Sequence, residues 1–446
     1  MKNQFSFYVI LSVLILNVMT LKAQDASLVA VPEDDGALMI KVSDNGRWAA
    51  GYFTSESVYM GASIWNLETY ERIRLVPEGQ SASAFDVTDD GSVAVGTYNN
   101  KPAYCQNGIW TELPMPVAGG IGEVWGVTPD GSKMVGKVYS SDWSAGYACL
   151  WVNGELTQVN HASADRFGDN AYFNEMVGIS ADGNTMLGCL NYVVLPNRTA
   201  FLIKNGEYFM FGAENYDPLQ GGSTYNFYDV LSMSPNGKWV TGDIYWVEEM
   251  WVSEYFCPFR YDVENDITEL FLDYPETASF AVDDAGNLFG ANPLNFPIRD
   301  AYILKNGTWV LLDQEILTEY GLDVMAETGY SKLSNVFSVS ADGKTIVGVN
   351  GMNTFNWVLK LPPPVGGNEM TPVATEMKAE VRGSKLLMQG KIAHVSIVNS
   401  LGNLILDQDI KMPVIDLSNF ASGMYVVTMR DIHGNQKSNK VMVRGY

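Results

Sequence analysis

Short runs in which hydrophobic and polar residues alternate follow one another along most of the chain, separated by turns that contain glycine. In one recurring unit, an apolar run reaches a turn of the form Val-Ser/Thr-x-Asp-Gly, and a second glycine follows five residues later inside another apolar run. Alternation with a period of two is typical of β-strands that bury one face. Asp-Gly favours a hairpin turn because glycine adopts positive φ without a steric clash. The pattern therefore predicts a series of β-hairpins.

The unit occurs seven times, and its first glycines lie between 40 and 57 residues apart, close to the period of a four-stranded propeller blade. The copies are Val42–Gly46 with Gly51, Val87–Gly91 with Gly96, Val127–Gly131 with Gly136, Ile179–Gly183 with Gly188, Met233–Gly237 with Gly242, Val282–Gly286 with Gly290, which is one residue shorter, and Val339–Gly343 with Gly348. The repeat predicts an all-β protein with a seven-bladed β-propeller.

The second copy shows the predicted blade most compactly. Its four strands are expected at residues 81–88, 92–98, 102–106 and 109–113, with Asn107-Gly108 as the second hairpin turn. The same third strand and turn recur before Gly154, Gly206 and Gly307. Both hairpin turns of a blade lie on one face of a propeller, so the longer connections are expected on the opposite face, here called the long-loop face.

The last copy lacks a fourth strand, because its third strand runs into three consecutive prolines, Pro362 to Pro364. Proline cannot donate a ladder hydrogen bond, so this segment is not a strand. Ser27–Pro32, near the start of the chain, has the pattern of a fourth strand that lacks the first three. We expect this segment to complete the seventh blade and thereby join the two ends of the ring.

The motif Val-Ser-x-Asp-Gly-x-x-Val-x-Gly, followed by Ala-Phe/Tyr-x-x-x-Asn-Gly, resembles the HAF family of extracellular repeats found in secreted bacterial proteins. The resemblance covers about residues 35–360. It implies a secreted propeller and no common activity, because the family shares an architecture rather than a reaction.

The two ends of the chain predict export. Residues 1–23 combine Lys2, an apolar stretch and Leu21-Lys-Ala23, which is typical of a cleavable signal peptide. The alternative, a membrane anchor, is disfavoured because the apolar stretch is short for a bilayer span. We therefore expect no transmembrane segment in the mature chain, a propeller over residues 24–361, and a Pro/Gly-rich linker over residues 362–371.

Residues 372–446 contain three blocks in order, Val395–Gly402, Ile415–Val427 and Lys440–Val443, that are similar to the C-terminal sorting domain of the type IX secretion system of Bacteroidota. The resemblance implies that the secretion machinery binds this tail, that the protein crosses the outer membrane, and that the tail is removed before release or attachment to surface lipopolysaccharide. An ordinary binding domain that stays attached is the alternative. Alternating strands predict a small Ig-like β-sandwich. The residues assigned to the sorting signal are Gly402, Asp416, Leu417, Gly423, Tyr425 and Lys440.

Charge differs sharply between the two regions. The chain has a formal net charge of −23, whereas residues 372–446 hold nine Lys/Arg against six Asp/Glu. A strongly negative repeat region repels phosphate backbones and anionic lipid, which argues against nucleic acid as a partner. The four cysteines have no CxxC or zinc spacing, and the sequence leaves open whether they form disulfides or remain buried thiols.

Aromatic residues gather in the segments expected on the long-loop face, where binding sites are common. Rings beside carboxylates suit sugars, because a ring packs on the apolar face of a pyranose; the alternative is that these rings pack among themselves. The densest segment is 243–255. We predict a glycan or protein ligand, bound by Trp143, Tyr172, Phe173, Tyr225, Phe227, Tyr245, Trp246, Glu248 and Trp251.

The sequence contains little evidence for catalytic or metal-binding groups. Glu248 and Glu249 are adjacent in sequence, which rarely gives the separation that paired glycosidase carboxylates need. His161 has no matched nucleophile, and Asp262–Asp266 lacks the glycine and distal glutamate of a calcium loop and aligns with a hairpin turn. We therefore predict no catalytic residue, metal or cofactor. A polysaccharide-degrading enzyme and a structural or adhesive surface protein remain the alternatives.

Overall fold

The structure is a computed structural model. It describes residues 26–444, except 33–34, 56–57, 77–79, 144–145, 159–170, 193–197, 211–225, 250–252, 273–277, 293–298, 306, 351–354 and 363–375. The predicted signal peptide and most of the predicted linker therefore lie outside the described residues.

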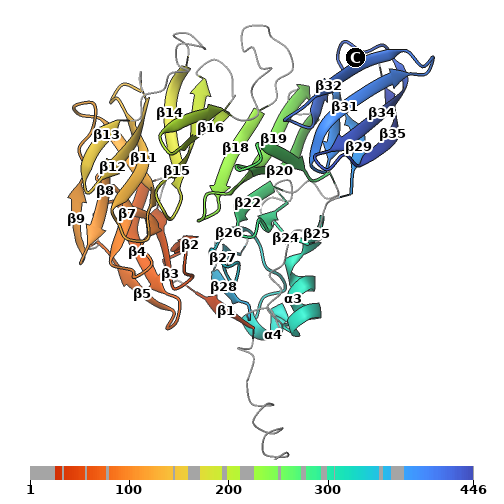
Figure 1. Ribbon diagram of the computed structural model, residues 1–446. Coiled ribbons are helices and arrows are strands. Elements are labelled where there is room, and N and C mark those ends of the chain that lie inside the picture. Colours follow the sequence, from red (N-terminus) through yellow and green to blue (C-terminus); the bar gives the residue numbers. More distant parts are fainter. Residues whose placement is uncertain are drawn as a thin grey trace, which may run out of the picture.

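Consecutive strands of the repeat region form antiparallel four-stranded units, which we number sheets 1 to 7 in chain order (Figure 1). Sheet 1 holds β2 (Leu38–Val42), β3 (Trp48–Ser55), β4 (Val58–Asn66) and β5 (Glu71–Arg74). Sheet 2 holds β6 (Ala82–Val87), β7 (Val93–Tyr98), β8 (Lys101–Gln106) and β9 (Ile109–Glu112). Sheet 3 holds β10 (Ile121–Val127), β11 (Lys133–Tyr139), β12 (Gly146–Val152) and β13 (Glu155–Gln158).

The remaining sheets follow the same order. Sheet 4 holds β14 (Ala171–Ile179), β15 (Thr185–Tyr192), β16 (Arg198–Lys204) and β17 (Glu207–Met210). Sheet 5 holds β18 (Asn226–Met233), β19 (Trp239–Glu249), β20 (Ser253–Asp262) and β21 (Ile267–Leu270). Sheet 6 holds β22 (Ala278–Val282), β23 (Leu288–Ala291), β24 (Ala301–Lys305) and β25 (Thr308–Leu311). Sheet 7 holds β26 (Val336–Val339), β27 (Thr345–Val349), β28 (Asn356–Lys360) and β1 (Ser27–Val31).

The recurring turns have the predicted geometry. Gly91 has φ +72°, and Asn107 and Gly108 both have positive φ, as a two-residue hairpin of this type requires. The Asp262–Asp266 segment is likewise the turn between β20 and β21. The prediction of four-stranded units joined by Asp-Gly and Asn-Gly turns is therefore confirmed.

The second glycine of each unit is required for a different reason: it lies opposite a β-bulge in the first strand of the sheet. In sheet 2 the register shifts between Ala84 and Asp86, opposite Gly96, and a Cβ at Gly96 would overlap the carbonyl oxygen of Ser83. A comparable shift occurs in the first strand of every one of sheets 1 to 7. Glycine is therefore required there because the bulged neighbour approaches too closely for a side chain.

The two ends of the repeat region meet in sheet 7. β1 pairs with β28 in antiparallel register from Ser27↔Lys360 to Val31↔Asn356, so the predicted fourth strand is confirmed. Sheet 7 is in turn bonded to sheet 1, since the Ala341 amide donates to the Asp44 carbonyl (2.8 Å). Figure 1 shows β1 beside β28, at the junction with sheet 1.

Two short helices lie between sheets 6 and 7, where the sequence pattern predicted only a connection. α3 (Leu312–Tyr320) buries Leu312 and Ile316 against the core of sheet 7 and ends at Gly321 in the left-handed conformation. α4 (Val324–Thr328) begins at Asp323, whose side chain accepts the Ala326 amide. The two helices are too short to show a clear helical period in the sequence, so the hydrophobic pattern does not reveal them.

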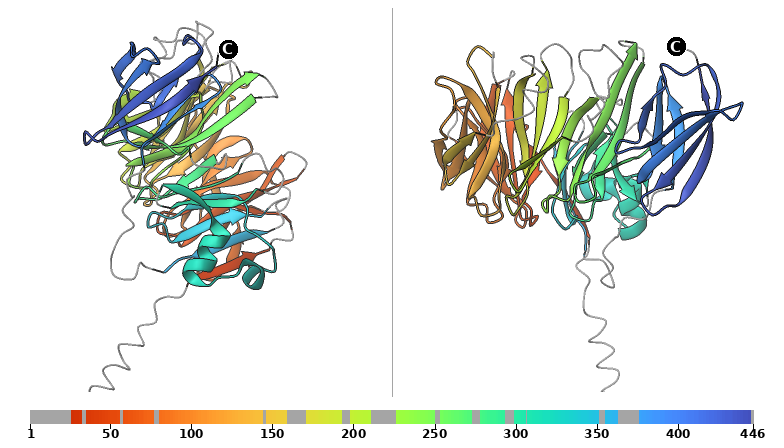
Figure 2. Two further views of the ribbon diagram at one scale, coloured as in Figure 1. Left: turned by 90° about the vertical axis from the view of Figure 1, so that its right-hand side faces the viewer. Right: turned by 45° about the horizontal axis from the view of Figure 1, so that its top comes forward.

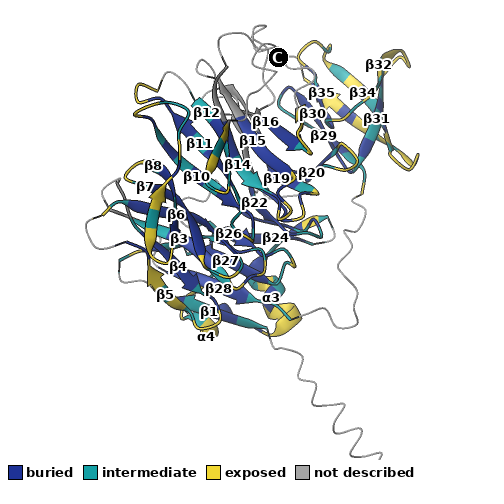
Figure 3. Cartoon of the chain, turned by 60° about the vertical axis from the view of Figure 1, so that its left-hand side comes forward, coloured by how far each residue is buried: buried dark blue, intermediate teal, exposed yellow. Residues whose placement is uncertain are grey.

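The C-terminal region forms two packed sheets. One contains β32 (Leu404–Asp409), β31 (Ile392–Asn399), β34 (Gly423–Asp431) and β35 (Gln436–Val443); the other contains β29 (Lys378–Arg382), β30 (Lys385–Gln389) and β33 (Val414–Asp416). Buried Leu386, Ile397 and Val427 belong to the core between them. Edge strand β32 is largely exposed, as is outer strand β5 of sheet 1, whereas the inner strands of the repeat region are mostly buried (Figure 3).

Candidate functional site

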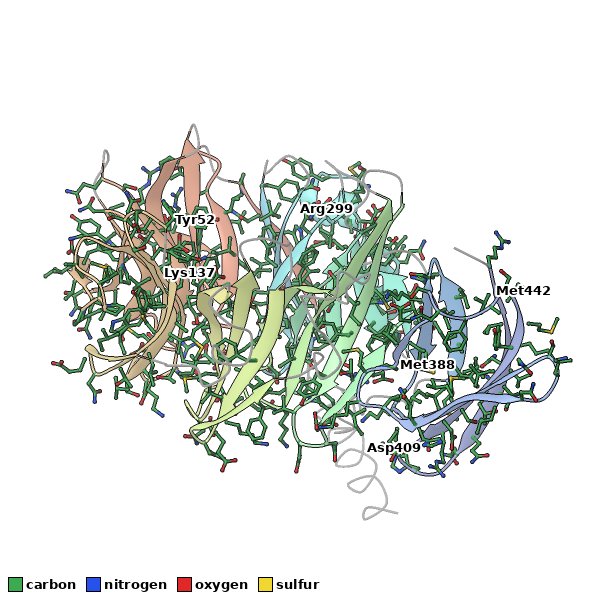
Figure 4. The ribbon with its side chains drawn as sticks, turned by 90° about the horizontal axis from the view of Figure 1, so that it is seen from above. Tyr52, Lys137, Arg299, Met388, Asp409 and Met442 are labelled. Atoms are coloured by element: carbon green, nitrogen blue, oxygen red, sulfur yellow. The ribbon has the colours of Figure 1, made fainter. Side chains whose placement is uncertain are left out.

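Aromatic and charged side chains from sheets 1 to 4 form a continuous group near the long-loop face. We call it the aromatic arc, and its members come from first and second strands of these sheets: Tyr52, Phe85, Glu123, Trp125, Lys137, Tyr139 and Glu175. Figure 4 labels Tyr52 and Lys137 on these neighbouring sheets.

Bulges place the two central rings of the arc. Phe85 and Trp125 are the residues that the register skips in β6 and β10, and a bulge re-aims a side chain in this way. Their rings stack 4.5 Å apart and 7° from parallel, and Tyr52 meets Phe85 edge-on at 5.6 Å. The same bulge that demands the second glycine of the repeat therefore also orders these aromatic side chains.

The polar part of the arc surrounds one lysine. The Lys137 ammonium lies 3.6 Å from a carboxylate oxygen of both Glu123 and Glu175, and 5.3 Å from the Trp125 ring centroid. Trp125 Nε1 donates to Glu123 at 3.0 Å, and the Tyr139 hydroxyl donates to Glu175. Two carboxylates face one ammonium, so this polar part carries a net negative charge and can accept hydrogen bonds from hydroxyl or cationic groups.

Trp143 extends the arc to the surface. Its side chain is 56% exposed, and its ring lies 5.0 Å from that of Tyr139. Trp143 has φ +60°, an unusual conformation for a bulky residue, and its amide donates to the Ser140 carbonyl at 2.9 Å. A large exposed ring held in an unfavourable backbone conformation is the kind of feature that binding sites retain.

The structure describes the other predicted ligand-binding residues only in part, and their role in binding stays a prediction. Tyr225 and Trp251 lie outside the described residues. Tyr172 and Phe173 lie in β14, Phe227 in β18, and Tyr245, Trp246 and Glu248 in β19, where the backbone but not the side chains is described.

The expectation of a long loop at 243–255 is wrong in its local structure. β19 and β20 continue as a hairpin through this segment, with Tyr245 opposite Phe256 and Trp246 opposite Tyr255. Tyr, Trp and Val favour strands, and their alternation extends the ladder of sheet 5 beyond the repeat. Tyr245, Trp246 and Tyr255 therefore lie on the two strands of a β-ribbon.

Glu123, Trp125, Lys137 and Glu175 are not among the residues predicted from the sequence, because they lie in strands and not in the connections where ligand groups are expected. The signal was present, since charged residues interrupt strands that are otherwise apolar, such as β10 and β14. Arg299, on sheet 6 before β24, was missed as well; within the described part of the chain its buried Nε has no hydrogen-bond partner (Figure 4).

Two carboxylates of the repeat are removed from water to different extents: Asp44, in the first Asp-Gly-type turn, is half-buried, and Asp86, within β6, is buried. Burial, reinforced by the nearby Asp86 carboxylate, raises the pKa of Asp44 to about 7. Burial also raises the pKa of Asp86 to about 6, although the Val127 amide of the next sheet donates to it at 3.1 Å. Among the residues that the structure describes, no three His, Cys, Asp or Glu side chains are placed to hold a metal ion.

The four cysteines, Cys105, Cys149, Cys189 and Cys257, are all buried free thiols. Burial raises the pKa of Cys149 and of Cys257 to about 12. These two thiols are therefore protonated at neutral pH, and a nucleophilic role is disfavoured.

The predicted sorting-signal residues divide between core and surface of the C-terminal domain. Leu417 and Tyr425 are buried, and the Tyr425 hydroxyl donates to the Ala421 carbonyl at 2.8 Å. Asp416 accepts the buried Lys385 ammonium at 2.8 Å; burial acts to raise its pKa, but the bonds from Lys385 and Ser418 hold it below its usual value. On the surface, Gly402 lies in the β31–β32 turn, Gly423 begins β34, and Lys440 lies on β35.

Comparison with known families and structures gives two results. Residues 373–444 match the secretion system C-terminal sorting domain. No protein with a curated description matches the chain significantly.

Solved structures resemble the chain in fold. An oligogalacturonate lyase in complex with manganese aligns with a TM-score of 0.50 and 12% identity, over 76% of this chain and 97% of that one. The hydrazine synthase of Kuenenia stuttgartiensis aligns with a TM-score of 0.46 and 13% identity, over 74% of this chain and 97% of that one. TolB from Acinetobacter baumannii aligns with a TM-score of 0.36 and 11% identity, over 74% of this chain and 65% of that one. At this level of identity the similarity concerns the fold alone, and the alignment with the lyase supports a β-propeller-like fold for the repeat region.

The described residues contain no helix that is both long and apolar enough to cross a bilayer. The family match confirms the predicted sorting tail. This tail in turn indicates where the protein is delivered. The C-terminal domain of this chain is a secretion system sorting domain, and the protein is exported by type IX secretion to the cell surface or beyond.

Proposed function

We propose that this protein is a seven-bladed β-propeller of the HAF-repeat type that binds a glycan or a protein outside the cell through its long-loop face. In this proposal sheets 1 to 7 are the blades of a closed ring, and the C-terminal domain is an Ig-like sandwich that is removed after secretion. Residues 1–23 act as the signal peptide.

The aromatic arc is the observation that carries the proposal. Its ring stack runs from Tyr52 through Phe85 to Trp125. Tyr139, whose hydroxyl donates to Glu175, lies beside the exposed ring of Trp143. Phe85, Tyr139 and Glu175 are buried, so a ligand would contact half-buried Tyr52, Trp125 and Glu123 together with exposed Trp143. Rings offer flat apolar contact, and a fixed carboxylate accepts hydrogen bonds from hydroxyl groups, which is the combination that sugars and polar protein surfaces need. A few convergent polar groups beside aromatic rings are typical of a binding site on a rigid scaffold.

The exported chain, purified with its C-terminal domain, can be tested on an array of glycans and by pull-down of surface proteins. Trp143→Ala is expected to weaken ligand binding by about tenfold or more, because an exposed anchoring ring is lost. The matched control is Phe209→Ala, which removes another exposed ring, on outer strand β17 of sheet 4. Equal binding by both variants and the unchanged protein would remove the arc from consideration.

A polysaccharide-degrading enzyme is distinguished in the same experiment. Release of reducing ends or unsaturated products from a bound polysaccharide would replace the binding proposal by an enzymatic one. Absence of both ligand and turnover, together with self-association or cell adhesion, would favour the structural alternative.

A further inference from the structure

The outer strand of sheet 5 differs from those of its neighbours because another part of the chain covers it. β30 of the C-terminal domain pairs in parallel with β21 at Leu270↔Gln389, so β29, β30 and β33 extend sheet 5 to seven strands. Figure 2 shows the blue C-terminal domain against the green sheet 5 in both views.

Hydrogen bonds fix the register of this junction. The Leu272 amide donates to the Gln389 side chain at 2.8 Å, and the Leu272 carbonyl accepts the Arg382 guanidinium at 2.6 Å. Gln389 is buried, so its side-chain bond is made away from water. The edge of sheet 5 would otherwise present unpaired backbone groups. It is bonded by side chains of the C-terminal domain and by the Lys411 carbonyl, which accepts the Thr268 amide at 3.4 Å.

Apolar packing joins the two domains at the same place. Leu387 and Val414 of the C-terminal domain belong to one buried cluster with Leu270 and Leu272 of sheet 5. Leu270, Leu272 and Leu387 are each at most 2% exposed. The domains therefore share a continuous core across this edge.

Charge complements the packing. The Lys411 ammonium lies 2.6 Å from a carboxylate oxygen of Asp266, and that of Lys391 lies 3.7 Å from Asp262. Lys391 also lies 5.5 Å from the Trp239 ring centroid. The positively charged tail thus contacts carboxylates of the negatively charged repeat region.

The repeat itself shows that sheet 5 is adapted to this contact. In each sheet the second glycine pairs with a residue of the third strand, and that residue pairs in turn with one of the outer, fourth strand. This outer-strand residue is Arg74 in sheet 1, Glu112 in sheet 2 and Gln158 in sheet 3. In sheet 5 the equivalent residue is Leu270, which is fully buried. Sheets 4 and 6 also have an apolar residue there, Met210 and Leu311, and Leu311 remains half-buried.

We propose that the outer edge of sheet 5 is a docking surface that holds the sorting domain noncovalently, so that cutting the linker does not by itself release this domain. Its occupant is residues 378–443 of the same chain. Release then needs a second step, dissociation of the β21–β30 junction. The proposal is independent of what the long-loop face binds.

The test uses the full exported chain with a recognition site for a sequence-specific protease placed within residues 363–371. After complete cleavage, the two fragments are expected to co-elute in size-exclusion chromatography at micromolar concentration. Leu270→Arg, which introduces the residue found in sheet 1, is expected to weaken fragment association by at least about 30-fold, because it places a charge in the shared core. Glu112→Arg is the matched control, and its fragments should still co-elute.

A second pair of variants covers the case in which Leu270→Arg does not fold. Asp266→Lys should weaken association, and the exchange with Lys411→Asp should restore part of it, because the ion pair is re-formed with opposite polarity. Immediate separation of the unchanged fragments at micromolar concentration would overturn the proposal. Co-elution that Leu270→Arg and Asp266→Lys both leave unaltered would place the contact elsewhere and overturn it too.

Discussion

Sheets 5 and 7 each gain a strand from a distant part of the chain, but in different ways. In sheet 7, β1 pairs with β28 over five consecutive residue pairs. In sheet 5, β30 meets β21 through a single backbone pair. One further backbone bond, from the Thr268 amide to the Lys411 carbonyl at 3.4 Å, and side-chain bonds complete the contact. The first is a continuous ladder, whereas the second is a contact between two domains that each have a core of their own.

This difference separates closure of a fold from docking of a domain. β1 buries Leu28 and Val31 in the cores on either side of it, so sheet 7 is incomplete without it. The C-terminal domain has its own buried cluster between its two sheets, and it adds buried Leu387 and Val414 and half-buried Met412 to the core of sheet 5. We expect loss of β1 to destabilise the ring and loss of the sorting domain to leave it folded.

The largest effect is expected from deleting residues 26–31. The deletion removes the burial of Leu28 and Val31, about 2 kcal/mol each, together with the β1–β28 ladder. We expect a loss of roughly 5 kcal/mol or more in the free energy of unfolding, and a fall in Tm of more than about 10 °C, measured by differential scanning calorimetry.

The matched comparison is a chain that ends at residue 371 and therefore lacks the sorting domain. Its ring should melt much closer to the full chain than the deletion of β1 does. If both truncations lower Tm equally, the distinction between closure and docking fails.

An intermediate effect is expected when sheet 7 is disturbed from inside by Gly348→Ala. A Cβ at Gly348 would overlap the Trp357 ring and the Asn335 carbonyl oxygen. We expect a loss of about 2 to 3 kcal/mol in urea unfolding, because the surrounding core is closely packed. Gly206→Ala is the control: Gly206 has φ +82° but no neighbour within 4 Å, so only about 1 kcal/mol of backbone strain is expected. A larger loss for Gly206→Ala would contradict the packing argument.

The smallest effect concerns Asp44, at the bond that joins sheet 7 to sheet 1. Its pKa is about 7 in the folded protein and near 3.8 when unfolded, so between these values the folded state binds more protons. Stability therefore falls as pH rises from 4 to 7 and levels off above pH 7. Asp44→Asn is expected to raise the free energy of unfolding on the order of 1 kcal/mol at pH 8 and to have little effect at pH 4.

Asp90 provides a control of opposite sign. Hydrogen bonds from Ser92 and Thr88 hold its pKa below the usual value, so its charged form is favoured by folding. Asp90→Asn should lower stability at pH 8 rather than raise it, as measured by thermal melts over a pH series. If both variants changed stability at pH 8 in the same direction, burial would not be what sets the pKa of Asp44.

Much of the fold could be predicted because the residues of the repeat determine its turns and strands locally. Asp-Gly and Asn-Gly fix the hairpins, and the alternation of Ala82–Val87 and Val93–Tyr98 fixes two strands of sheet 2. The fourth strand of sheet 7 could also be found, since Ser27–Val31 lacks a local partner and the last repeat lacks a strand. α3 and α4 could not, because a helix this short is stabilised by the core that it covers rather than by its own sequence.

The candidate site was predicted less well. Trp143 was found because aromatic residues in a connection stand out. Glu123 and Glu175 were not, since they lie in strands of adjacent sheets and approach Lys137 only when those sheets pack side by side. Trp246 was assigned to a loop, although its β-propensity continues a hairpin.

By itself the sequence determined the strands, their turns, the sorting tail and the segment that joins the ends, because each depends on backbone preferences and local alternation. Only the tertiary structure decided that rings from sheets 1 to 3 stack into one arc, and that Leu270 faces the sorting domain instead of water. The physical reason is that contacts between sheets depend on how bulged and twisted strands pack across a ring, which no single stretch of residues encodes.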